Sequence, residues 1–97
     1  MEELAERFDE RLRQSCRLSS ELGFTPTVFM GVLGRHGGVQ TAKRLILAGG
    51  IQNGLHRLAE LGQLDISMER IMMEPEFASL FTADELAAAQ WRLDRLS

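Results

Sequence analysis

The apolar residues of this chain recur mostly at the spacing of amphipathic helices, and the apolar–polar alternation of strands is missing. A first helix is predicted over residues 2–22, because Leu4, Phe8, Leu12 and Cys16 fall at every fourth position and form one apolar stripe. Gly23 follows, and glycine readily adopts the left-handed conformation that ends many helices.

A second helix is predicted to begin with Thr25 as its N-cap and Pro26 as its first helical residue. Two glycines, Gly31 and Gly34, lie inside this helix, and each weakens it by about 1 kcal/mol relative to alanine. Such glycines are typical of places where another backbone packs closely. The segment ends at Gly37-Gly38.

Three further helices are predicted before the last one. The first covers residues 39–48 and ends at a Gly49-Gly50 break, and the next begins near Asn53 and ends at Gly62. The third begins at Ser67, which is placed as an N-cap with an Ile66–Ile71 hydrophobic staple. It ends near Glu74, because the residue before a proline avoids the helical conformation.

The last helix has the best-specified start. Thr82 and Glu85 have the spacing of a capping box, and Phe81 and Leu86 have the spacing of its staple. The sequence therefore predicts an all-α fold: residues 1–97 form a single compact bundle of five to six helices. The long first and last helices pack over the shorter central ones.

Length and composition agree with one folded domain. The chain has 97 residues, of which 44% are hydrophobic and 26% are charged, values close to those of average soluble domains. It opens without a basic and apolar leader and contains no long apolar run. Its single cysteine suits a reducing compartment. We therefore expect a cytoplasmic protein without a membrane segment.

The formal net charge of −3 hides an uneven distribution along the chain. Residues 22–59 contain no Asp or Glu and carry a charge of +4, whereas residues 1–21 carry −2 and residues 60–97 carry −5. Such asymmetry indicates a partner of defined charge. The basic middle either forms an exposed face or is neutralised by the acidic helices.

Three groups of residues are candidates for contact with a partner. An acidic face could stand in for the phosphates of a nucleic acid, and it comprises Glu69, Glu74, Glu76, Asp84 and Glu85. A basic face comprises Arg35, Lys43, Arg44 and Arg57. Trp91 lies beside the apolar stripe of the last helix and is a candidate hydrophobic anchor.

The residues suited to catalysis or metal binding are few. Cys16 lies on the apolar stripe of the first helix and is interpreted as a buried core thiol. His56 and Glu60 are spaced to share one helix face, but a zinc site requires at least three protein ligands. We predict no catalytic residue, no metal site and no cofactor, and the chain is not expected to be an enzyme.

Two nucleotide- or DNA-binding motifs are considered and disfavoured. The glycines at 31–38 lack the Gly-Lys-Ser/Thr sequence of a phosphate-binding loop. Residues 39–61 could form a helix-turn-helix in which Gln52, Asn53 and Arg57 read DNA. However, the break between these helices is loose, and an overall negative charge lowers affinity for phosphates.

Three segments resemble a widespread group of small bacterial proteins without an established activity. The matching pieces are Gly37-Gly38-Val39 with Ala42-Lys43-Arg44-Leu45, the run from Leu58 to Ser67, and Glu74-Pro75-Glu76-Phe77 with Leu80-Phe81-Thr82. Ala59 departs from the pattern, which has a tryptophan at this position. The resemblance implies a small module of mobile elements or phage conflict, and it brings no catalytic residue.

The function predicted from the sequence is therefore that of a non-enzymatic protein–protein interaction module. It would be a small adaptor or inhibitor that acts by binding and occlusion, in phage defence or counter-defence, in the manner of an anti-CRISPR inhibitor. The partner would be a protein, and the charge pattern would also suit a homodimer. The alternative is a nucleic-acid-binding regulator that uses the basic central helices.

Overall fold

The computed structural model describes residues 2–48 and 53–96. Over these residues the chain forms helices and turns without a strand, so the predicted all-α fold is confirmed. The α-helices are α1 (Glu2–Glu21), α2 (Thr27–His36), α3 (Gly38–Leu47), α4 (Asn53–Glu60), α5 (Met68–Met72) and α6 (Ala83–Leu96). Two short 3-10 turns are η1 (Leu64–Ile66) and η2 (Ala78–Leu80). In the part of the chain described, no helix is long and apolar enough to cross a membrane.

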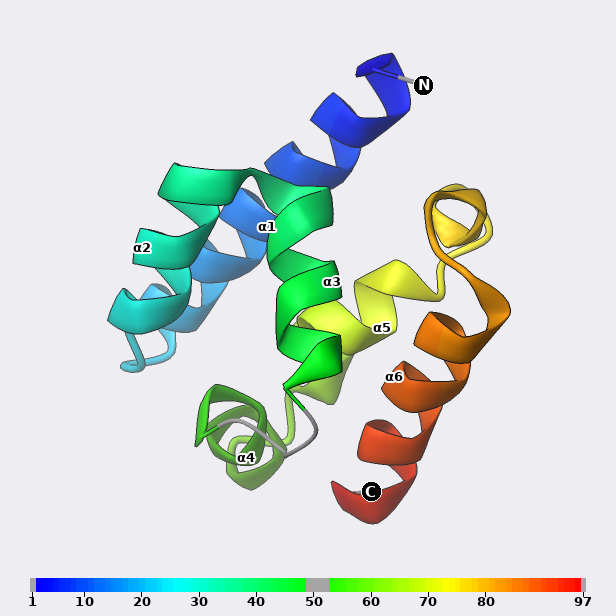
Figure 1. The fold of residues 1–97 in the computed structure, drawn as a ribbon. Coiled ribbons are helices and arrows are strands. Elements are labelled where there is room, and N and C mark those ends of the chain that lie inside the picture. The colour runs from blue at the N-terminus through cyan, green and yellow to red at the C-terminus, as the bar shows by residue number, and fades with distance from the viewer. Residues whose placement is uncertain (1, 49–52, 97) are drawn as a thin grey trace.

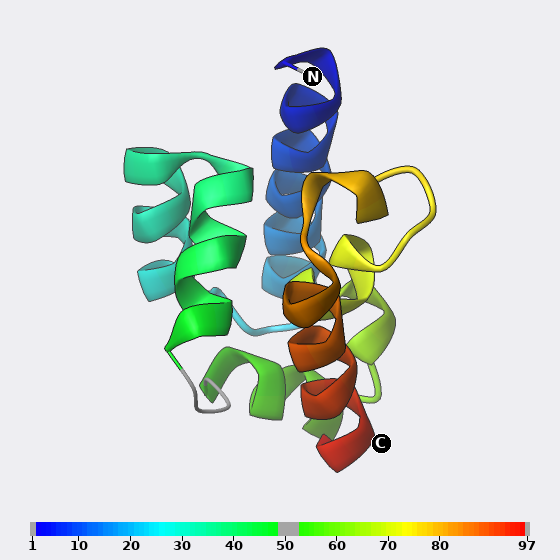
Figure 2. The same ribbon diagram turned by 45° about the vertical axis from the view of Figure 1, so that its right-hand side comes forward.

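Helix α1 forms the centre of the fold. In Figure 2 it runs down the middle of the molecule, with α2 and α3 on one side and α5 and α6 on the other. Figure 1 shows α4 closing one end, beside the C-terminal halves of α3 and α6. The first and last helices are the longest, with 20 and 14 residues, as the sequence predicts.

The core lies between α1, α3 and the segments that follow α4, with Leu33 contributed by α2. Phe8 of α1 is fully buried and meets two other rings edge-on, Phe77 at 5.4 Å and Phe81 at 5.2 Å between ring centroids. Edge-to-face packing is a preferred arrangement of aromatic pairs. The apolar stripe of α1 continues through Leu12 and Cys16, both buried, so the predicted core face of the first helix is confirmed.

Helices α1 and α3 touch through a glycine. A Cβ atom on Gly38 would lie 2.8 Å from the Cα of Asp9, a distance that side chains do not tolerate. The same approach lets the N–H of Gly38 donate to the carboxylate Oδ1 of Asp9 at 2.8 Å. By contrast, a Cβ on Gly31 or Gly34 would meet nothing within 4 Å, so the predicted close packing at these two residues is wrong.

Most predicted helix starts are confirmed, and one is wrong. The Ser67 hydroxyl accepts from the N–H of Arg70, and Thr82 and Glu85 exchange both hydrogen bonds of a capping box. Thr25 does not cap α2, because Pro26 has a non-helical ψ of 72° and the helix begins one residue later, at Thr27. The predicted Gly49-Gly50 break lies outside the described residues.

The C-terminal end of α3 is held by a buried arginine of α6. Arg92 is only 2% exposed, and its Nη2 donates to the carbonyls of Leu45 and Ile46 at 3.1 Å each. Both carbonyls belong to the last turn of α3, where backbone acceptors are short of partners, although the Leu45 carbonyl also accepts from the N–H of Ala48 at 3.3 Å. Helix α3 is therefore capped by side chains of two other helices, Asp9 at its start and Arg92 at its end.

Candidate functional site

The predicted acidic face does not exist as one exposed surface. Glu69 is only 3% exposed, so its assignment to a partner-binding face is wrong. Glu74 and Glu76 bind Arg11 and Arg7 of α1, the latter at 2.7 Å between Arg7 Nε and Glu76 Oε2. Glu74 and Glu76 therefore connect the segment after α5 to α1.

Two predicted face residues pair with each other. Lys43 of α3 donates to Glu85 of α6 at 2.8 Å, and Glu85 also accepts from the backbone N–H of Thr82. Partial burial acts to raise the pKa of Glu85, but these hydrogen bonds outweigh it and lower the pKa below its usual value. Glu85 is thus a structural anchor between α3 and α6. Of the five predicted acids, Asp84 is exposed and forms no ion pair with any described residue.

The basic middle segment is half neutralised. Lys43 binds Glu85, and Arg57 lies 3.5 Å from Glu60 on the same exposed side of α4. Arg35 on α2 and Arg44 on α3 are exposed, and neither forms an ion pair within residues 2–48 and 53–96. The positive charge available to a partner therefore belongs to these two arginines.

Trp91 is 47% exposed on α6, and the guanidinium of Arg95 lies 4.5 Å from the centre of its ring. This stacking within one helix accounts for the position of the indole. Arg95 covers one face of the ring, so Trp91 offers a partner less apolar surface than a free indole would.

The residues considered for catalysis lie apart from one another. Cys16 is buried, and burial raises the pKa of its thiol, as expected for a core cysteine. His56 and Glu60 are exposed on α4, and Glu60 pairs with Arg57. Among the described residues, no three His, Cys, Asp or Glu side chains gather where a metal ion could bind.

The outer face of α2 was not predicted from the sequence. We define this face by Val28, Gly31, Gly34 and Arg35, all exposed. Val28 is 83% exposed. Met30 lies on another side of the helix, where it lines a groove with Arg13 and Arg17 of α1. A Cβ on Gly31 or Gly34 would meet nothing within 4 Å, so the backbone of the outer face is bare.

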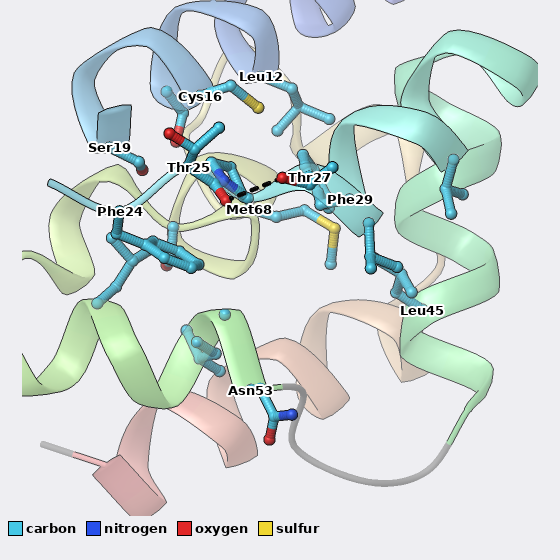
Figure 3. A pocket seen from close by; sticks show the side chains of 18 of the residues that line it. Leu12, Cys16, Ser19, Phe24, Thr25, Thr27, Phe29, Leu45, Asn53 and Met68 are labelled. Carbon is cyan, nitrogen blue, oxygen red and sulfur yellow. Dashed lines mark hydrogen bonds between the residues drawn. The ribbon is translucent and has the colours of Figure 1, made fainter. Parts of the chain in front are cut away.

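A recess of about 670 Å³ opens beside α2. Figure 3 shows side chains of α1, α2, α3, α4 and α5 converging on it, with Phe24 and Phe29 on opposite sides and Met68 between them. Its wall is mainly apolar and includes Leu12, Val32, Leu45, Leu55 and Leu58. Glu69 is its one carboxylate among the described lining residues.

Comparison with known protein families, curated proteins and solved structures gave no match. Two features of this chain are candidates for binding a partner or a ligand. One is the outer face of α2, and the other is the recess beside it.

Glu69→Gln is expected to raise the free energy of unfolding by about 1 kcal/mol at pH 7. Burial raises the pKa of Glu69 above its usual 4.5, although its own backbone N–H and the charge of Arg92 act in the opposite direction. The folded chain therefore holds this proton more tightly than the unfolded chain does. The stability that the protonated acid contributes is present below pH 4.5 and is lost as the pH rises through the folded-state pKa.

Urea denaturation of both proteins at several pH values measures this effect. The free energies of unfolding of the two proteins should be equal near the usual pKa of the acid. As the pH rises, the free energy of unfolding of the wild type should fall below that of Glu69→Gln. If the wild type instead became more stable than Glu69→Gln as the pH rises, that result would contradict the raised pKa.

Proposed function

We propose that the protein is a non-enzymatic interaction module that binds a helix of a partner protein on the outer face of α2 and occludes the surface of that partner. The observation that supports this proposal is the bare backbone of Gly31 and Gly34 beside the 83% exposed Val28. Interior glycines cost a helix about 1 kcal/mol each, and no contact with another described element compensates for them here. A partner helix could approach this backbone closely and bury Val28.

The charges beside this face favour an acidic partner. Helix α2 ends with Arg35 and His36 and contains no acidic residue. Arg35 is exposed and unengaged by any acid among the described residues. An amphipathic helix with an apolar stripe and an Asp or Glu opposite Arg35 therefore fits the face best. Such a charge pair would chiefly fix orientation and speed association.

The alternative of nucleic-acid binding has less support. Two of the four predicted basic residues, Lys43 and Arg57, are bound to acids of the chain. Arg35 and Arg44 alone provide few phosphate contacts, and affinity for nucleic acid grows with the number of such contacts. A gel shift at about 50 mM salt tests this alternative, because phosphate contacts are strongest at low salt. A shift that is lost in Arg35→Ala and Arg44→Ala would favour it over the proposal.

Val28→Asp is expected to weaken partner binding at least about tenfold, because it places a charge in the apolar centre of the face. A photocrosslinking residue at position 28 in the native host would capture the partner. Titration calorimetry with the purified partner then compares the wild type, Val28→Asp and Gly31→Ala. The alanine variant should be about 1 kcal/mol more stable than the wild type and yet bind more weakly, because its methyl group occupies the space a partner backbone needs.

Asp84→Asn is the matched control, since Asp84 is an exposed acid on α6. It should leave the affinity unchanged. Loss of binding in Asp84→Asn together with full binding by Val28→Asp would move the interface to the acidic side of the molecule. If the captured partner is a second copy of the chain, light scattering should show a dimer that Val28→Asp dissociates.

A further inference from the structure

The recess between α1, α2, α3, α4 and α5 opens to solvent. At about 670 Å³ it falls within the range of small-molecule sites, roughly 300–1,000 Å³. Its walls are mainly apolar side chains of these five helices and of the segment before α2, so an apolar body would be in contact on several sides.

Two buried hydroxyls of the recess already have partners within the chain. The Ser15 hydroxyl donates to the carbonyl of Ile66, and the Ser67 hydroxyl accepts from the N–H of Arg70. These groups hold the floor of the recess in place. They would not be released for a ligand without cost to the fold, because a buried polar group left without a partner is destabilising.

Glu69 differs from these groups. It lines the recess and is only 3% exposed, and no Lys, Arg or His of the described residues lies within 4.0 Å of its carboxylate. Its contacts are its own backbone N–H and the more distant charge of Arg92. No basic side chain occurs among the described residues that line the recess. A buried carboxylate without an adjacent cation is costly unless a partner completes it.

We propose that this recess binds a small molecule with an apolar body and one cationic group, with the carboxylate of Glu69 as the anchor of the cation. A primary ammonium would supply the positive charge that no described lining residue provides, and charge-assisted hydrogen bonds are the stronger kind. The apolar body would lie against Phe24, Phe29 and Leu58. An anionic ligand is disfavoured, because it would bring a second negative charge beside a buried one.

The experiment uses three probes with the same alkyl chain, namely octylammonium, octanol and octanoate. Titration calorimetry of the whole chain measures the affinity for each. We expect octylammonium to bind about tenfold more tightly than octanol, and octanoate to bind more weakly than octanol. Methyl resonances of Val32, Leu55 and Leu58 should shift on binding, which places the probe in the recess.

Glu69→Gln keeps the shape of the side chain and removes its charge. In this variant octylammonium and octanol should bind equally within about twofold, with octanol binding retained. Glu76→Gln is the matched control, because it removes the same charge from an exposed residue that pairs with Arg7. It should preserve the preference for the ammonium.

Three results would overturn the proposal. They are equal affinities for octylammonium and octanoate in the wild type, an ammonium preference that survives in Glu69→Gln, and shifted resonances that lie outside the recess. None of these results bears on partner binding by the outer face of α2. Because Val28 also lines the recess, Gly31→Ala, at a residue outside the recess, tests that binding separately.

Discussion

Gly38→Ala is expected to lower the free energy of unfolding by about 3 kcal/mol. The new Cβ would lie 2.8 Å from the Cα of Asp9, 3.1 Å from its N and 3.1 Å from Cδ2 of Phe8. Two of these atoms belong to the backbone of α1, so relief requires α1 and α3 to move apart. That movement would also lengthen the hydrogen bond between the Gly38 N–H and Asp9. A small domain has roughly 5–15 kcal/mol of stability, so the loss is a large share of it.

Urea denaturation followed by circular dichroism measures this loss, and Gly31→Ala is the matched control. Both variants add one methyl group to a helical glycine, but the Cβ at residue 31 meets nothing within 4 Å. The control should gain about 1 kcal/mol from helix propensity. Equal stability changes in the two variants would show that α1 and α3 do not approach each other as described.

Arg92→Met is expected to lower the free energy of unfolding by about 3 kcal/mol. Methionine fills much of the same volume, so the variant tests polar contacts more than packing. It withdraws the donor from the carbonyls of Leu45 and Ile46. It also removes the positive charge that favours the ionised form of the buried Glu69. Both losses occur where water cannot substitute, because Arg92 is 2% exposed.

Arg95→Met serves as the control for Arg92→Met. Arg95 lies three residues further along α6, is exposed, and stacks on Trp91. Its replacement should change stability by no more than about 0.5 kcal/mol. Thermal denaturation of both variants, with hydrogen exchange of the α3 amides, separates the two effects. Faster exchange confined to α3 in Arg92→Met is the expected signature, and unchanged exchange there would contradict its capping role.

Local signals in the sequence predicted most of the fold. The stripe from Leu4 to Cys16, the Ser67 cap and the Thr82–Glu85 capping box involve residues within one helix or one turn. Such signals can be interpreted without knowing how distant segments meet. The start of α2 was predicted wrongly for the same reason. Thr25-Pro26 has the pattern of an N-cap followed by a first helical residue, and this pattern does not reveal that Pro26 has a non-helical ψ.

The candidate site depended on contacts between distant residues, which no local pattern contains. Glu69 looks like any acid in the first turn of a helix, yet the packing of α5 places it in the interior. The position of Arg92 near the end of α6 is typical of an arginine that interacts with the last carbonyls of its own helix. Instead it caps α3 by donating to the carbonyl of Ile46, which lies 46 residues earlier in the chain. The glycines posed the same problem, since Gly38 and not Gly31 meets another backbone.

The double capping of α3 by Asp9 and Arg92 has a consequence for the order in which the chain folds. During synthesis from the N-terminus, α3 emerges while α6 is still unmade, so its last turn lacks the donor of Arg92. Lys43 of α3 likewise meets its acid, Glu85, only when α6 begins. Helix α3 therefore gains both caps only after α6 has been made. A chain shortened before residue 92 would still contain α3 but would lack the cap on its last turn.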